Sequence, residues 1–223
     1  MANDVTEDEL RLTWQVPAGG ADDREHYPTP HAFTMHLLRY LDARGELIRG
    51  VCPTLDPCCG EGKILEAVRG YRPVHGMRLL GIEIDAVRAT CAAQVADDVR
   101  IADALKVEWP AGAIVTNPPF TLALDFARRC VHQVVTRKAP FAAMLLRQTW
   151  LEMTRDRAAF LQDHPPTVLV FPEARASFAG KGKDMAPTHW FVWGLTPLDR
   201  MTNDGRRMAE AVAAHAEIAW LKR

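Results

Sequence analysis

The chain has 223 residues, of which 48% are hydrophobic and 25% charged. This composition is typical of one folded domain around a single core, and it excludes collagen-like, low-complexity and intrinsically disordered classes. The net charge of −1 hides an asymmetry: residues 1–120 carry 12 Lys and Arg against 18 Asp and Glu, whereas residues 121–223 carry 15 against 10. A basic second half suits a polyanionic partner, although unequally charged solvated surfaces have the same signature.

No apolar run reaches the ~18 residues that a membrane span needs, and the N-terminus is acidic where a signal peptide is basic and then apolar. We therefore expect a cytoplasmic protein without a membrane segment. The five cysteines form no Cys-x-x-Cys pair, and His26, His31 and His36 do not share a helix face. Reduced thiols and no metal site are the expectation.

The predicted elements alternate along the chain. Residues 1–26 mix charges with glycines and predict an N-terminal arm, and residues 27–223 form one domain that begins with a helix over 31–47. Short apolar runs predict strands at 52–55, 78–82, 99–101, 113–115, 142–146, 168–171 and 189–194, and residues 206–221 predict a final helix. The fold class is therefore α/β: a Rossmann-like, doubly wound, seven-stranded and mostly parallel sheet, with an antiparallel last strand because no crossover helix fits before it.

A glycine-containing loop follows the first predicted strand, in the segment Asp56-Pro57-Cys58-Cys59-Gly60-Glu61-Gly62. Glycine lets a ligand approach the backbone closely, and the helix predicted from Lys63 offers unpaired N–H groups. The segment is not a phosphate-binding P-loop, because that motif needs Gly at position 57 and Ser or Thr at position 64, where this chain has Pro and Ile.

Acidic residues end the next two predicted strands. Glu83 closes an apolar run 21 residues after Gly62, where a carboxylate can accept hydrogen bonds from both hydroxyls of a ribose. Asp103 follows the third strand and can accept from an adenine amino group. In register with the glycine loop, these two acids predict a nucleoside site.

The fourth strand stops at Asn117-Pro118-Pro119-Phe120. Two consecutive prolines fix φ and remove two N–H donors, so the turn is rigid and neighbouring carbonyls are left to accept hydrogen bonds from another molecule. The alternative is a simple strand terminator with an exposed Phe.

Together these motifs resemble class I S-adenosylmethionine-dependent methyltransferases, specifically DNA adenine-N6 methyltransferases of the compact phage and prophage type. The resemblance covers residues 27–195, and Tyr27-Pro28-Thr29-Pro30 resembles the segment that precedes the cofactor loop in one subclass. It implies S-adenosyl-L-methionine as cofactor. The residues that would hold the cofactor are Thr29, Pro30, Asp56, Pro57, Cys58, Gly60, Gly62, Glu83, Ile84, Asp103 and Asn117. Either Glu83 or Asp85 would hold the ribose.

The resemblance also implies the chemistry. The Asn117 side-chain oxygen and the Pro118 carbonyl would accept the two hydrogens of the adenine amine, Pro119 would complete the turn, and Phe120 would stack on a base flipped out of double-stranded DNA. An Arg-x-x-Phe pattern, a basic loop and an aromatic last strand follow downstream. From these we expect DNA contacts from Arg175, Phe178, Lys181 and Lys183.

Some alternatives stay open. Trp190 and Trp193 suit base stacking, but burial in the sheet is favoured. Asn-Pro-Pro-Phe or Tyr also occurs in methyltransferases that act on guanine N2 of ribosomal RNA or on a protein glutamine amide, and a methyltransferase fold can serve as a non-catalytic binding subunit.

Overall fold

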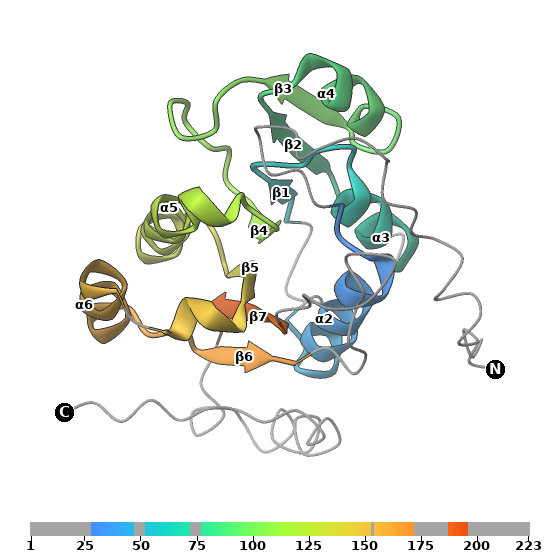
Figure 1. Ribbon diagram of the computed structural model, residues 1–223. Helices are drawn as coiled ribbons and strands as arrows, with labels where there is room; N and C mark the ends of the chain where they lie inside the picture. Colours follow the sequence, from blue (N-terminus) through green and yellow to red (C-terminus); the bar gives the residue numbers. More distant parts are fainter. Residues whose placement is uncertain (1–27, 47–51, 72–76, 153, 172–186, 196–223) are drawn as a thin grey trace, which may run out of the picture.

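The protein forms a twisted seven-stranded sheet with helices on both faces (Figure 1). The computed structural model describes residues 28–46, 52–71, 77–152, 154–171 and 187–195. The strands are β1 (Thr54–Asp56), β2 (Leu79–Glu83), β3 (Asp98–Ile101), β4 (Ala113–Thr116), β5 (Ala142–Arg147), β6 (Val168–Val170) and β7 (Thr188–Trp193). The helices are α2 (His31–Ala43), α3 (Lys63–Tyr71), α4 (Ala86–Ala92), α5 (Ala123–Val135) and α6 (Arg155–Asp163), with 3-10 turns η1 (Phe120–Leu122) and η2 (Gln148–Leu151).

The strand order is β3-β2-β1-β4-β5-β7-β6. The first five strands of this order are parallel, and β7 pairs antiparallel with both β5 and β6. The predicted fold class is confirmed, including the antiparallel last strand. From β1 the strands follow one another outward to β2 and β3 on one side, whereas β4 and β5 lie on the other side. Ligands of doubly wound proteins bind at such a switch point, outside the carboxyl ends of the strands.

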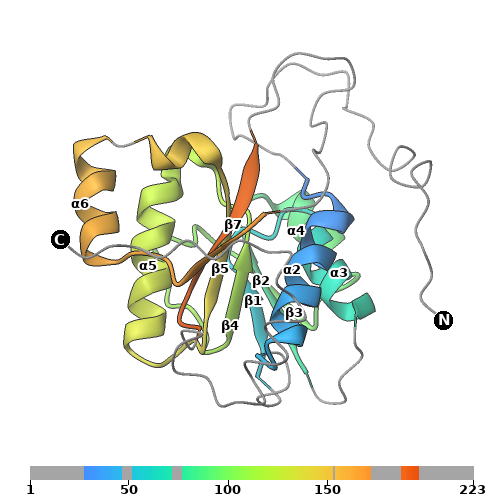
Figure 2. The same ribbon diagram turned by 90° about the horizontal axis from the view of Figure 1, so that it is seen from below.

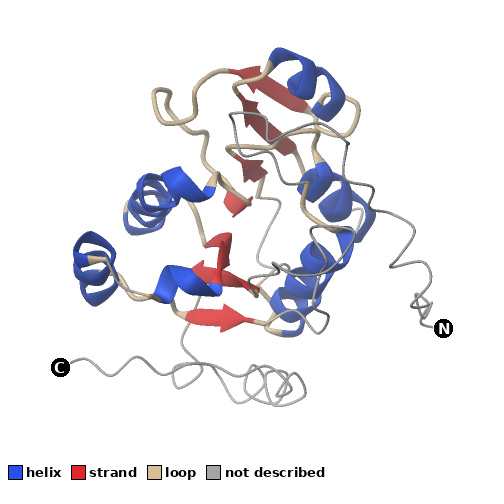
Figure 3. Cartoon of the chain, viewed as in Figure 1, coloured by secondary structure: helices blue, strands red, loops and turns tan. Residues whose placement is uncertain are grey.

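Two apolar layers hold the helices on the sheet. One contains buried side chains of α2, α3 and α4, and the other those of α5 and α6, so the helices form separate layers (Figures 2 and 3). The strands β1, β2, β4 and β7 are buried along their whole length because both of their faces are covered. Their near-continuous apolar sequences follow from this double coverage.

The aromatic last strand belongs to the core. Trp190 is fully buried and Trp193 is 4% exposed, and the Trp190 indole N–H donates to the Phe33 carbonyl of α2 at 3.0 Å. Burial in the sheet, the favoured alternative for these two residues, is confirmed.

Some predicted boundaries were wrong by a few residues. The first helix ends at Ala43 because Gly45 adopts a φ of +70°, while the N–H groups of Gly45 and Glu46 donate to the carbonyls of Asp42 and Leu41. This is the Schellman arrangement that ends many helices. The first strand begins at residue 54, two residues later than predicted. The predicted arm over 1–26 and the predicted helix over 206–221 lie outside the described residues.

Candidate active site

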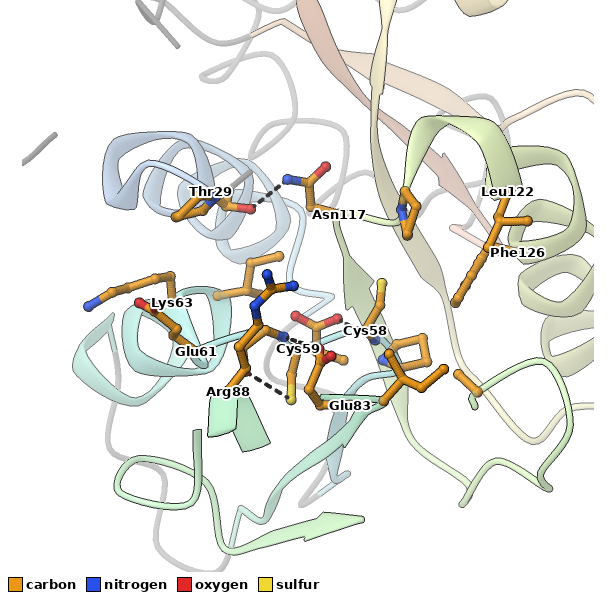
Figure 4. A pocket seen from close by; sticks show the side chains of 18 of the residues that line it. Thr29, Cys58, Cys59, Glu61, Lys63, Glu83, Arg88, Asn117, Leu122 and Phe126 are labelled. Atoms are coloured by element: carbon orange, nitrogen blue, oxygen red, sulfur yellow. Dashed lines mark hydrogen bonds between the residues drawn. The ribbon is translucent and has the colours of Figure 1, made fainter. Parts of the chain in front are cut away.

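A pocket opens at the carboxyl ends of β1, β2 and β4, at the switch point of the sheet (Figure 4). The loops after these strands meet there with the segment that precedes α2. Ten of the predicted residues line it: Thr29, Asp56, Pro57, Cys58, Gly60, Glu83, Ile84, Asp103, Asn117 and Pro119. Further lining residues, which the sequence did not single out, include Arg88, Leu122 and Phe126.

Glu83 is fixed at the pocket wall by two backbone N–H groups. Its Oε2 accepts from Gly60 N at 2.8 Å, and its Oε1 accepts from Asp85 N at 2.9 Å. The Asp85 side chain instead caps α4, because its Oδ1 accepts from the backbone N–H groups of Val87 and Arg88. Of the two acids at the end of β2, Glu83 lines the pocket and Asp85 begins the next helix.

The two glycines of the loop after β1 differ in what they contact. Gly60 lines the pocket and donates to Glu83. Gly62 has a φ of +85° and is absent from the described lining; a β-carbon on it would lie 2.8 Å from Val95 Cγ2 and 3.1 Å from Ala92 Cα. Gly62 therefore lets α3 begin directly against the end of α4, and its predicted contact with the cofactor stays a prediction.

Opposite the loop, the pocket has an apolar wall beside a carboxylate. Ile84 is 56% exposed and Leu122 is 41% exposed, so both present bare hydrocarbon in the pocket. Asp103 Oδ2 pairs with Lys106 at 3.0 Å and Oδ1 accepts from Leu105 N, and these contacts lower the pKa of Asp103. A planar apolar group with a hydrogen-bond donor on its edge fits this surface.

Asp56 lies deeper and links β1 to β4. Its Oδ1 accepts from Thr116 Oγ1 at 2.8 Å and from Cys58 N at 3.2 Å, while Cys58 Sγ lies 2.8 Å from the same Thr116 hydroxyl. The side chain is 1% exposed, and burial raises the pKa of Asp56 to about 7. Burial and Asp56 together raise the pKa of Cys58, so its thiol stays protonated. This network fixes the end of β4 immediately before Asn117.

The Asn117 side chain is held by Thr29, which lies 88 residues earlier in the sequence. Its Nδ2 donates to Thr29 Oγ1 at 3.0 Å, and the amide oxygen points away from Thr29 (Figure 4). Pro118 is buried, and the Pro119 carbonyl accepts from Leu122 N at 3.0 Å as η1 begins. The Asn-Pro-Pro turn therefore presents one defined amide orientation.

Phe120 and Pro118 are not in the described lining of the pocket. Phe120 lies just beyond it, half-buried at the start of η1, with the Arg147 guanidinium stacked on its ring at 4.2 Å from Cζ to the ring centroid. Pro30, also predicted for the cofactor, immediately precedes α2 and is likewise absent from that lining.

The predicted DNA contacts Arg175, Phe178, Lys181 and Lys183 lie outside the described residues. Within the described part of the chain, no three His, Cys, Asp or Glu side chains group as a metal site requires. In the same part, no helix combines the length and apolar character of a membrane span.

The architecture matches solved methyltransferase structures. The methyltransferase subunit of a type I restriction-modification system from Streptococcus thermophilus matches with a TM-score of 0.59 and 15% identity, over 88% of this chain and 55% of that chain. A putative RNA methyltransferase from Pyrococcus horikoshii matches with a TM-score of 0.59 and 13% identity, over 84% of this chain and 97% of that chain. No protein-family model and no curated protein sequence matches.

With its sheet order and antiparallel β7, the chain has the fold of class I S-adenosylmethionine-dependent methyltransferases. It spans about half the length of the restriction-modification subunit that it resembles.

Proposed function

We propose that this protein transfers a methyl group from S-adenosyl-L-methionine to the exocyclic N6 amine of adenine in DNA. The observation that carries the proposal is the Asn117 amide, whose nitrogen is bound to Thr29 while its oxygen points elsewhere, in a pocket also lined by Glu83 and Asp103. A fixed carbonyl oxygen beside a pocket lined by two carboxylates and an exposed apolar side chain suits the orientation of an amine.

The pocket chemistry fits the adenosine part of the cofactor. Glu83 would accept from the two ribose hydroxyls, Ile84 would cover one face of the adenine ring, and Asp103 would accept from the adenine amino group, since all three residues line the pocket. Asp56, Cys58 and Thr29 line the same pocket and would face the methionine end, with Pro30 next to Thr29 in the sequence but outside the described lining. When bound, S-adenosyl-L-methionine supplies an electrophilic methyl group, which the amine nitrogen accepts as the carbon–sulfur bond breaks.

The role of the Asn-Pro-Pro turn follows from the electronic structure of the substrate. An exocyclic amine is a weak nucleophile because its lone pair is delocalised into the ring. If the Asn117 oxygen and the Pro118 carbonyl accept its two hydrogens, the nitrogen becomes more tetrahedral and its lone pair is aimed at the methyl carbon. The methylated ammonium is acidic and loses its extra proton to a carbonyl or to water, so no strong base is required.

DNA is the proposed substrate because the turn Asn117-Pro118-Pro119-Phe120 resembles that of DNA adenine-N6 methyltransferases, and the basic second half of the chain suits a polyanion. The five cysteines are all unpaired, which suits a reducing cytoplasm. The alternatives are methylation of guanine N2 in RNA, methylation of a protein glutamine amide, and cofactor binding without methyl transfer. The following experiment distinguishes them.

Mass spectrometry of nucleosides and protein digests from cells that express the protein tests this proposal. N6-methyladenine should accumulate in DNA with the wild type and not with Asn117→Ala. The exposed Asp125→Ala variant on α5 is the matched control and should behave as the wild type. Accumulation of N2-methylguanine or methylated glutamine instead would replace the DNA substrate with RNA or protein.

A further inference from the structure

Arg147 and Phe120 form a cation–π pair at the mouth of the pocket. The Arg147 guanidinium carbon lies 4.2 Å from the centroid of the Phe120 ring. Arg147 is the last residue of β5, and Phe120 is the first of η1, four residues after the end of β4. Because β4 and β5 are parallel neighbours, both residues lie at the carboxyl end of the sheet, which is the end where the pocket opens.

Three other arginines of the basic half find acceptors within the protein. Arg128 pairs with Asp125, Arg129 donates to the carbonyls of Ala104 and Val107, and Arg157 donates to carbonyls of η2. Arg147 is exposed and has no carboxylate or carbonyl partner among the described residues. Its N–H donors are therefore directed at solvent from a position that the Phe120 ring fixes.

We propose that Arg147 binds a backbone phosphate of the substrate strand next to the target nucleotide. The proposal rests on the proposed function. A guanidinium that stacks through its face keeps its N–H groups at its edge, and this planar array of donors matches two phosphate oxygens. Holding the group in advance reduces the conformational entropy lost on binding.

Three variants test this inference: Arg147→Ala, Arg147→Lys, and Arg128→Ala as a control that removes the same charge from the same half of the chain. The measurements are kcat and KM on a short adenine-containing duplex, the salt dependence of duplex binding, and calorimetric affinity for the cofactor. Thermal unfolding of each variant separates lost binding from lost folding.

We expect Arg147→Ala to raise KM about tenfold and to reduce the slope of log K against log salt by about 1, with cofactor affinity unchanged. Arg147→Lys should retain the slope but only part of the affinity, because an ammonium lacks the planar donor array. Arg128→Ala should match the wild type. If the wild type methylates DNA and Arg147→Ala keeps the wild-type KM and salt slope, the inference about Arg147 is overturned and the proposed function stands. If the wild type does not methylate adenine in DNA, the proposed function fails as well.

Discussion

The Asn117 amide nitrogen donates to the hydroxyl of Thr29, a residue 88 positions earlier in the chain, at 3.0 Å. Thr29 is 6% exposed and immediately precedes Pro30 and α2, so its hydroxyl is held by a rigid segment. The contact holds the amide nitrogen toward Thr29, so the amide oxygen points away from Thr29. Thr29 is thus a positioning residue for the oxygen that the proposed reaction uses.

Thr29→Val removes this acceptor while it keeps the shape of the side chain, and Thr29→Ser keeps the hydroxyl. We expect Thr29→Val to lower kcat about fivefold to tenfold, the cost of one neutral hydrogen bond, and Thr29→Ser to retain most activity. Steady-state kinetics and cofactor calorimetry on both variants provide the measurement. A rise in cofactor Kd with kcat unchanged would assign Thr29 to cofactor binding instead.

Glu83→Ala should weaken cofactor binding by about tenfold to a hundredfold, because the acceptor proposed for the ribose is lost and Gly60 N loses its partner. Glu83→Gln keeps one acceptor oxygen and should fall between Glu83→Ala and the wild type. The exposed Glu108→Ala variant serves as the control. Equal calorimetric affinity in all four proteins would remove Glu83 from the cofactor site.

Gly62→Ala should destabilise the fold by about 1–3 kcal/mol, since the new β-carbon meets Val95 Cγ2 at 2.8 Å and φ is +85°. Gly70 lies in α3 with no atom within 4 Å of the position of a β-carbon. Gly70→Ala should therefore be neutral or stabilising by up to about 1 kcal/mol. Chemical denaturation gives both free energies of unfolding, and similar values for the two variants would refute the packing role of Gly62.

The raised pKa of Asp56, about 7 against an ordinary 3.8, makes stability depend on pH. Below about pH 4 the carboxyl is protonated in both the folded and the unfolded state, so it adds no pH dependence. Between about pH 4 and pH 7 the carboxyl ionises more readily in the unfolded state, so the free energy of unfolding falls as the pH rises. Asp56→Asn keeps the acceptor oxygen for Thr116 and does not titrate. The free energy of unfolding of the wild type should therefore fall relative to Asp56→Asn between pH 4 and pH 7. A difference that stays constant over this window would contradict the role of burial.

The sequence predicted the sheet and the pocket together because the carboxyl ends of parallel strands meet at one edge. Residues that follow β1, β2, β3 and β4 in the sequence, namely the loop from Asp56, Glu83, Asp103 and Asn117, therefore had to lie near one another. Alternating short strands and helices were sufficient to establish this order.

Contacts between distant segments could not be predicted in the same way. The need for glycine at position 62 comes from Val95 in the turn after α4, and the orientation of Asn117 comes from Thr29. The stack of Arg147 on Phe120 likewise depends on the register of β4 and β5. No local sequence pattern carries these distances.

The division of roles between Glu83 and Asp85 was open in the sequence because both acids follow the same strand. A cap at position 85 could have been suspected from Asp followed by Ala-Val-Arg at a helix start. The structure separates them, since Asp85 Oδ1 accepts the N–H groups of Val87 and Arg88 whereas Glu83 lines the pocket.

The central claim is that Asn117 acts chiefly on the substrate amine although it also lines the cofactor pocket, and a paired measurement on purified Asn117→Ala tests it most directly. Calorimetry should give a cofactor affinity close to that of the wild type, while single-turnover methylation of adenine N6 in a DNA duplex should fall at least about a hundredfold. Methyl transfer to adenine N6 at the wild-type rate, or a loss of cofactor binding as large as the loss of transfer, would contradict the account.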